Sequence, residues 1–196
     1  MVDSETLNVM LLVTDVLDEL TVPYVIGGSM ASIIHGMIRT TMDADIVADL
    51  KSEQVGQFVA SLRERFYVDE TAVHQALNQH GSFNLIHLTT MFKVDIFIPK
   101  NRAFDRQQLK RRISEKIASD SNKSVWVLSA EDIILAKLDW FRLGGEVSER
   151  QWRDVLGVIK TQESTLDIPY LQEWSQQLGI ADLLVRVLDE ISPPKS

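Results

Sequence analysis

The stretch Tyr24-Val25-Ile26-Gly27-Gly28-Ser29 decides how the first half of this 196-residue chain folds. Its three apolar residues follow Pro23 and stop at two glycines, which is typical of a short buried strand that ends in a tight turn. Ser29 is well placed to cap a helix that continues through Ile34. Two adjacent glycines are often no more than a turn, but without β-carbons the backbone N–H groups and the serine hydroxyl can approach a phosphate group. The stretch therefore predicts strand, turn and helix, with a candidate phosphate site at Gly27, Gly28 and Ser29.

A second strand is expected at Asp43-Ala44-Asp45-Ile46-Val47-Ala48. Side chains alternate between the two faces of a strand, so the carboxylates of Asp43 and Asp45 emerge on the same side. Mg²⁺ prefers hard oxygen ligands and is commonly held by one or two carboxylates together with phosphate oxygens and water. An Asp-x-Asp pair alone is equally compatible with an exposed strand end. Together with the glycine turn, it predicts a site for nucleotide-bound Mg²⁺ or Mn²⁺.

A third carboxylate, Asp95, lies inside the apolar run from Lys93 to Ile98. An unpaired charge buried there would be unfavourable, so the residue calls for a metal ion or another strong partner. If its strand lies beside that of Asp43 and Asp45, three carboxylates converge. That arrangement suits two-metal phosphoryl transfer.

The remaining apolar periods predict a mixed sheet flanked by helices, an α/β (α+β) fold. Runs 84–87 and 93–98 suit an antiparallel hairpin, although no glycine marks the turn between them. Ser129 with Asp132 resembles a capping box with Asp in place of Glu. We expect a core over residues 1–128 and a C-terminal helical lobe over 129–196 packed against it. The expected helices span 4–20, 29–34, 52–66, 129–143, 148–160, 169–178 and 180–191, and a further strand spans 124–128.

The bulk composition narrows the classes of function. A net charge of −8 argues against a protein that coats nucleic acid, and the absence of cysteine excludes thiol chemistry. The apolar stretches are too short to span a membrane and no signal-peptide pattern is present, so we expect a cytoplasmic protein. One segment, residues 100–116, holds seven basic and two acidic residues. Such a charge run is usually a solvated helix face, but it could also bind phosphate or RNA.

The four histidines do not indicate a catalytic or metal site. His35, His74, His80 and His87 lack metal-ligand spacing, and structural roles are more common for such residues. His35 is the nearest to the glycine turn and stays a peripheral candidate. The turn does not match the Gly-x-Ser-x-Gly motif of hydrolases, so a hydrolase triad is disfavoured.

The three motifs together resemble the nucleotidyltransferase-fold superfamily, which includes the AbiEii-like abortive-infection toxins. The resemblance covers about residues 22–160 and rests on the segments 24–29, 39–46 and 92–97. It implies that the Gly-Ser element binds the phosphates of a nucleoside triphosphate. It also implies that Asp43, Asp45 and Asp95 bind metal ions and carry catalysis.

Further roles follow from the same resemblance. It implies that Lys137, on the helix after the core, reaches toward the nucleotide, although a lysine among apolar residues can also simply cover the core with its stem. Arg153 and Asp154 resemble the Arg-Asp pair of the next helix, but could equally form a structural ion pair. Arg39 and Thr41 precede the acidic strand, where they could contact phosphate or orient Asp43.

The leading hypothesis is an enzyme that transfers a nucleoside monophosphate from a metal-bound nucleoside triphosphate to an acceptor and releases pyrophosphate. The AbiEii resemblance implies RNA, such as a tRNA end, as acceptor and an antitoxin as partner. A small-molecule acceptor or a protein acceptor fits the acidic chain equally well. The rival hypothesis is a non-catalytic protein that binds nucleotide or a partner protein on the same fold.

Overall fold

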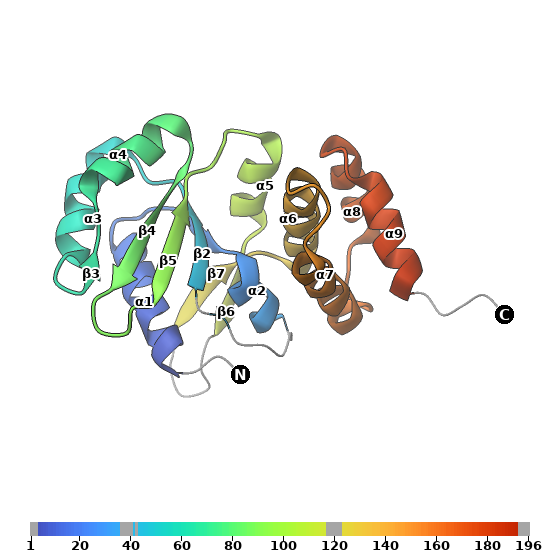
Figure 1. The fold of residues 1–196 in the computed structure, drawn as a ribbon, viewed down its shortest axis with the longest axis horizontal. Coiled ribbons are helices and arrows are strands. Elements are labelled where there is room, and N and C mark those ends of the chain that lie inside the picture. Colours follow the sequence, from blue (N-terminus) through green and yellow to red (C-terminus); the bar gives the residue numbers. More distant parts are fainter. Residues whose placement is uncertain (1–3, 36–40, 42, 117–122, 192–196) are drawn as a thin grey trace.

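A single sheet organises the protein. The computed structural model describes residues 4–35, 41, 43–116 and 123–191. Within these ranges the strands are β1 Tyr24–Ile26, β2 Asp43–Ala48, β3 Phe66–Tyr67, β4 Ser82–His87, β5 Lys93–Phe97, β6 Ile113–Lys116 and β7 Ser124–Val127. They form one seven-stranded sheet in the order β3-β4-β5-β2-β1-β7-β6 (Figure 1). Two segments far apart in sequence, β2 and β5, are therefore neighbours.

The sheet is mixed, as the sequence predicts. β2 pairs with β5 and β1 with β7 in parallel, whereas the other neighbouring strands are antiparallel. The β4–β5 hairpin is confirmed. Its turn includes Met91 with a φ of 58°, so the left-handed position that usually selects glycine is occupied here by methionine.

The helices of the described ranges lie along the whole length of the molecule (Figure 1). They are α1 Ser4–Glu19, α2 Gly28–Ile34, α3 Val55–Leu62, α4 Glu70–Gln79, α5 Ala103–Arg111, α6 Ala130–Leu143, α7 Glu149–Gln162, α8 Ile168–Gln177 and α9 Ala181–Ile191. In Figure 1, α3 and α4 lie at one end of the molecule and α6 to α9 at the other. α2 lies between them, in contact with β2, α6 and α7. No helix in the described part of the chain has the length and apolar character needed to cross a membrane.

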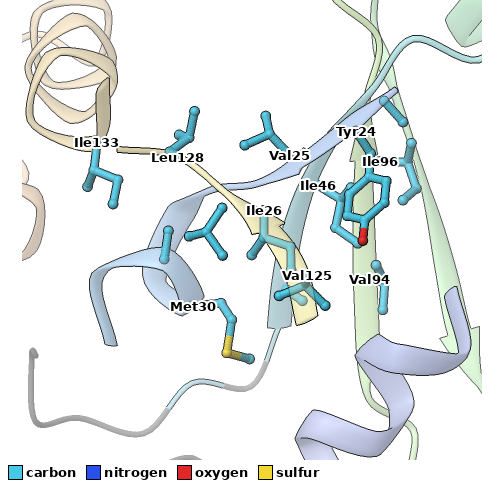
Figure 2. Close-up of a cluster of buried hydrophobic side chains, with 14 of the residues drawn as sticks. Tyr24, Val25, Ile26, Met30, Ile46, Val94, Ile96, Val125, Leu128 and Ile133 are labelled. Carbon is cyan, nitrogen blue, oxygen red and sulfur yellow. The ribbon is translucent and has the colours of Figure 1, made fainter. Parts of the chain in front are cut away.

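The core is centred on β1. Tyr24, Val25 and Ile26 are all fully buried, since β1 lies between two other strands and is covered on both faces (Figure 2). The same cluster of buried side chains continues through Ile133 of α6 to Leu183 of α9. The helical part thus shares the core of the sheet. The division into units of residues 1–128 and 129–196 stays a prediction.

Three elements differ from the sequence prediction. Phe66 was expected in a helix, because it continues the helical period one turn after Leu62, but it lies in β3 and pairs with His87. α4 was not predicted, since only Val73 and Ala76 of its residues are buried and its apolar period is weak. β6, at the end of the basic segment, was also not predicted, because only alternate residues of this edge strand are partly buried.

Candidate active site

The glycine turn differs in one detail from the expected cap. α2 begins at Gly28 with Gly27 as its N-cap, and no side chain caps it. The prediction that Ser29 caps the helix was therefore wrong, because Ser29 lies one residue inside the first turn. Its hydroxyl oxygen instead accepts a hydrogen bond from Nη2 of Arg150 on α7, at 3.2 Å.

The glycine turn and the acidic strand are packed as one unit. The backbone N–H of Gly27 donates to the carbonyl of Asp45 at 2.8 Å. Gly28 has a φ of +55°, and a β-carbon on it would lie 1.7 Å from Oδ2 of Asp45 and 2.8 Å from its Cβ. Only glycine fits here, because both the backbone angle and the space are closed to other residues.

The three predicted carboxylates lie on one face of two neighbouring strands. Asp43, Asp45 and the partly exposed Val47 alternate with buried residues along β2. In the parallel pairing, Asp45 lies opposite Asp95 of β5. Asp95 already has a partner, since its Oδ2 lies 2.8 Å from Nζ of Lys93. The strands of the three acids are therefore neighbours, as the sequence analysis expected.

Burial and crowding of negative charge act on Asp45. Desolvation, followed by the charges of Asp43 and Asp95, raises the pKa of Asp45 to about 6, although Lys137 and Lys93 oppose this shift. Asp43 is held by Thr41, whose hydroxyl lies 2.9 Å from Oδ1 of Asp43. Of the two roles left open for Thr41, this contact favours orienting Asp43.

A pocket of about 540 Å³ opens over the turn and the acids. One end is polar and includes Gly28, Ser29, Asp43, Asp45 and Lys137 in its lining. The lining also includes three apolar side chains on β5 and α6, namely Phe97, Trp140 and Leu143, beside the charged residues Lys100, Arg102 and Asp139. Thr41 and Asp95 lie outside the lining, so these two residues act at most from behind the pocket wall.

Lys137 reaches the polar end and is paired there. It is 9% exposed, and its Nζ donates to Oδ2 of Asp154 on α7 at 2.9 Å. A structural ion pair of Arg153 with Asp154 was one of two equal alternatives, but the described contacts do not include it, since the Arg153 guanidinium is 73% exposed and lies 3.5 Å from Glu149. Adjacent helical residues point in different directions, so Asp154 contacts Lys137 and Arg153 does not.

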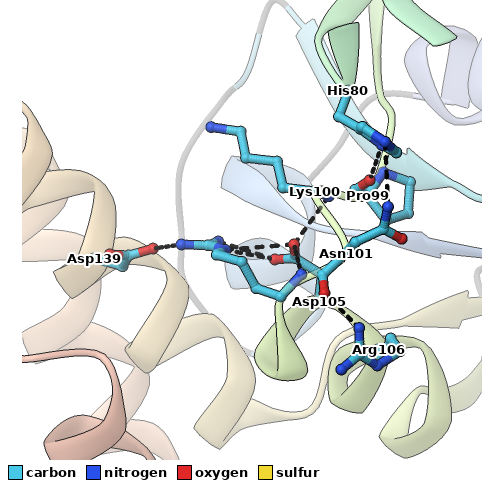
Figure 3. Close-up of polar contacts among 8 residues, drawn as sticks. His80, Pro99, Lys100, Asn101, Asp105, Arg106 and Asp139 are labelled. Atoms are coloured by element: carbon cyan, nitrogen blue, oxygen red, sulfur yellow. Dashed lines mark hydrogen bonds and ion pairs between the residues drawn. The ribbon is translucent and has the colours of Figure 1, made fainter. Parts of the chain in front are cut away.

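A network of polar contacts joins α5 to α6 beside Trp140 (Figure 3). Arg102 donates to both oxygens of Asp105 and, through Nη1, to Asp139 of α6 at 2.9 Å. The ammonium of Lys100 lies 5.8 Å from the ring centre of Trp140, and Phe97 meets that ring edge-on at 6.3 Å. The start of α5 is thereby tied to α6 across the pocket.

Much of the basic segment is used inside the protein. Arg111 lies 3.3 Å from Glu131 and over the ring of Tyr170. Arg112 donates to the carbonyl of Tyr24 and lies over Trp126. These contacts favour a structural role for the two arginines over a track for RNA.

The remaining candidates are placed as follows. His35 is buried and donates through Nε2 to the carbonyl of Leu128 at 2.8 Å, which is a structural role. His80, which sequence reasoning dismissed, lines the pocket and bonds through Nδ1 to the carbonyl of Pro99 at 2.7 Å. Arg39 lies outside the described residues.

Sequence reasoning also missed Arg150. Arg150 and Asp154 are four residues apart on α7, which places them on one helix face, and both line the pocket. The helical spacing could have indicated them as a pair. Only the fold shows that this face of α7 meets the glycine turn.

The residues suit a divalent cation in their chemistry. Carboxylate oxygens are the donors that Mg²⁺ and Mn²⁺ prefer. Burial is the largest cause of the raised pKa of Asp45, and the neighbouring charges of Asp43 and Asp95 add to it, so a cation would offset the second of these causes. Across the described ranges no three acidic or histidine side chains form a ready-made metal cluster. Of the three predicted acids, Asp43 and Asp45 line the pocket, and of the other lining carboxylates Asp154 is paired with Lys137 and Asp105 and Asp139 with Arg102.

Comparison with known proteins supports the fold. No protein-family model matches the chain, and no curated protein matches it. Among solved structures, it is similar to an antigenic nucleotidyltransferase-like protein from Paracoccidioides brasiliensis, with 19% identity and a TM-score of 0.65 over 96% of this chain and 90% of that one. It is also similar to the antibiotic-resistance factor ANT(2″)-Ia, with 16% identity and a TM-score of 0.55 over 95% of each chain.

These similarities define the structural class. The protein has an α/β nucleotidyltransferase-like fold, with the candidate site at the meeting point of β2, β5, α2 and α6. At such low identity the likeness establishes the fold alone, and the activity is inferred from the site.

Proposed function

We propose that the protein is a metal-dependent nucleotidyltransferase. An acceptor hydroxyl oxygen bonds to the α-phosphorus of a nucleoside triphosphate, the bond to the oxygen bridging to the β-phosphate breaks, and the pyrophosphate leaves with that electron pair. The hydroxyl proton passes to solvent. The observation that carries this proposal is the packing of Gly28 directly on Asp45, which places a turn open to phosphate against a carboxylate suited to a cation.

The roles of the residues follow from their positions. Asp43 and Asp45 would hold Mg²⁺ or Mn²⁺, which when bound supplies charge neutralisation at the reacting phosphate. Gly27, Gly28 and Ser29 present the turn to the phosphates. Outside the pocket lining, Asp95 of β5 adds negative charge beside Asp45, and Thr41 orients Asp43 from the preceding segment.

Lys137 has a defined place in this proposal. Its ammonium acts on Asp45 as a favourable charge and is held by Asp154. A buried cation fixed in this way can stabilise charge that develops on the nucleotide during transfer. Catalysis then depends mainly on positioning and electrostatics.

We infer that the acceptor is a small molecule. The pocket is about 540 Å³ and its lining includes the apolar side chains Phe97, Trp140 and Leu143, which suit a compact ring-bearing compound. Arg111 and Arg112, the centre of the basic segment, are committed to internal contacts. An RNA acceptor, toxin activity and an antitoxin partner, which the AbiEii resemblance implies, lack a comparable supporting contact and are the alternative outcome of the experiment below.

The test uses variants of the two pocket-facing acids. We expect Asp43→Asn and Asp45→Asn to lower nucleotidyl transfer by at least about 100-fold, because each removes anionic charge at the reacting phosphate. Asp45→Asn should not destabilise the fold, since burial already disfavours its charge. Asp49→Asn is the matched control, because Asp49 follows the same strand but pairs with exposed Lys51 and does not line the pocket.

The assay incubates each labelled nucleoside triphosphate and Mg²⁺ or Mn²⁺ with a panel of hydroxyl-bearing small molecules or with total RNA. Label on a small molecule, lost in the Asp43 and Asp45 variants, supports the proposal. Label on RNA would reject the small-molecule acceptor. Nucleotide binding without transfer to any acceptor would favour the non-catalytic alternative.

A further inference from the structure

The cations that line the pocket differ in how their charge is balanced. Lys137 is paired with Asp154, and Arg102 with Asp105 and Asp139. The other two lining cations are Lys100 and Arg150, and neither has a carboxylate within ion-pair distance among the residues that the structure describes. Lys100 lies over the ring of Trp140, whereas Arg150 contacts Ser29 of the glycine turn. Arg150 is therefore the cation with unbalanced charge at the polar end.

The contacts of Arg150 place it at the glycine turn. It lies in the first turn of α7, and its Nη2 is 3.2 Å from the hydroxyl oxygen of Ser29 on α2. Ser29 follows Gly28 directly, so the guanidinium lies beside the turn that packs on Asp45. A neutral hydroxyl accepts one hydrogen bond but does not neutralise the guanidinium charge, and the remaining donors of the fork stay available.

Guanidinium chemistry defines what this position would bind. A planar guanidinium binds phosphate oxygens through two parallel, charge-assisted hydrogen bonds. Lys137, the other cation at this end, is buried and already engaged by Asp154. Arg150 is exposed to solvent. Its side chain can move toward a ligand that enters the pocket without breaking an ion pair.

We propose that Arg150 binds the β- and γ-phosphates of the nucleoside triphosphate, and that it distinguishes a triphosphate from a monophosphate. This inference rests on the proposed nucleotidyl transfer. It adds a residue from α7 to a phosphate site otherwise formed by α2 and β2. During transfer Arg150 stabilises the charge that collects on the leaving pyrophosphate.

The proposal predicts a selective change in affinity. Arg150→Ala should weaken binding of a nucleoside triphosphate and of pyrophosphate by about tenfold to a hundredfold, since a hydrogen bond to a charged group contributes roughly 1.5–3 kcal/mol. Binding of the corresponding monophosphate should change by less than about threefold, because the lost contact is to phosphates that it lacks. Arg150→Lys should recover part of the affinity as a point charge without the planar fork.

A matched control lies on the same helix. Arg153→Ala removes an arginine of similar position and charge, but its side chain is 73% exposed, interacts with Glu149 and does not line the pocket. This variant should bind all ligands as the unaltered protein does. A general effect of lost positive charge on α7 would appear in both variants and is thereby separated from a specific contact.

The experiment is isothermal titration calorimetry of the full chain in Mg²⁺. The ligands are ATP, GTP, CTP, UTP, pyrophosphate and the monophosphate of whichever triphosphate binds most tightly to the unaltered protein. Equal weakening of triphosphate and monophosphate by Arg150→Ala, no weakening of either, or the same loss in Arg153→Ala would overturn the inference.

The two proposals fail in distinguishable ways. Arg150-dependent triphosphate binding without any transfer to an acceptor would refute the proposed function and leave this phosphate contact intact. Transfer that depends on Asp43 and Asp45 but not on Arg150 would refute the contact alone. Absence of nucleotide and pyrophosphate binding in the unaltered protein would refute both.

Discussion

Replacing Gly28 by alanine should damage both the fold and the site. Its φ of +55° lies in the left-handed region, where a residue with a β-carbon loses roughly 1–2 kcal/mol. The new β-carbon would lie 1.7 Å from Oδ2 and 2.8 Å from Cβ of Asp45, so rotation of that side chain alone does not relieve the clash. Forced overpacking adds roughly 1–3 kcal/mol. We expect the free energy of unfolding to fall by roughly 2–5 kcal/mol, the sum of these two effects.

Urea unfolding followed by circular dichroism measures this loss, with Gly56→Ala as the control. Gly56 lies in α3, and a β-carbon there meets nothing within 4 Å, so this variant should gain up to about 1 kcal/mol. A double-mutant cycle with Asp45→Gly isolates the clash, because Asp45→Gly removes all three close atoms. In the Asp45→Gly background, Gly28→Ala should lower the free energy of unfolding only by the roughly 1–2 kcal/mol that the left-handed backbone costs a residue with a β-carbon. An equal cost in both backgrounds, or a cost below about 1 kcal/mol, would refute the packing argument.

Three further outcomes follow from the structure. Asp154→Ala leaves the buried Lys137 without its ion-pair partner and should lower the free energy of unfolding by roughly 3 kcal/mol in urea titrations, with transfer reduced as well. Burial raises the pKa of Asp132 to about 6, so the folded state holds this proton more tightly and loses stability as pH rises from about 4 to about 6. Asp132→Asn keeps an acceptor for the hydroxyl of Tyr170 and should gain roughly 2–3 kcal/mol relative to the unaltered protein between pH 4.5 and 7, whereas a constant difference would contradict this account. Trp140→Ala should raise the KM for the acceptor more than that for the nucleotide, measured by steady-state kinetics, because Trp140 and Phe97 form the apolar surface proposed for the acceptor.

Local patterns were sufficient for much of the site. The period of two along β2 correctly placed Asp43 and Asp45 on one face, and the double glycine correctly marked the end of β1. The cap predicted at Ser29 was off by two residues, since the N-cap is Gly27 and a cap depends on the backbone angles of its neighbours. Ser129 caps α6 as predicted. The carboxylate of Asp132, however, accepts a hydrogen bond from the hydroxyl of Tyr170, 38 residues away, which local sequence patterns could not predict.

Partner choice among charged side chains could not be predicted in this way. Arg153 and Asp154 are adjacent in sequence, yet Asp154 pairs with Lys137 and Arg153 points to solvent. Likewise, the sequence shows an excess of positive charge in residues 100–116, but it does not show that Arg111 and Arg112 make internal contacts. Such pairs depend on distances between elements that are far apart along the chain.

The sequence by itself determined the order of most elements, the mixed character of the sheet, the glycine turn and the shared face of Asp43 and Asp45, because these depend on backbone preferences and on periods within a few residues. Only the tertiary structure decided that Asp95 lies opposite Asp45, that Gly28 is packed on the carboxylate of Asp45, and that Arg150 meets Ser29 across 121 positions. The physical reason is that strand register and helix packing are set by burial of the whole core, in which each segment's place depends on all the others.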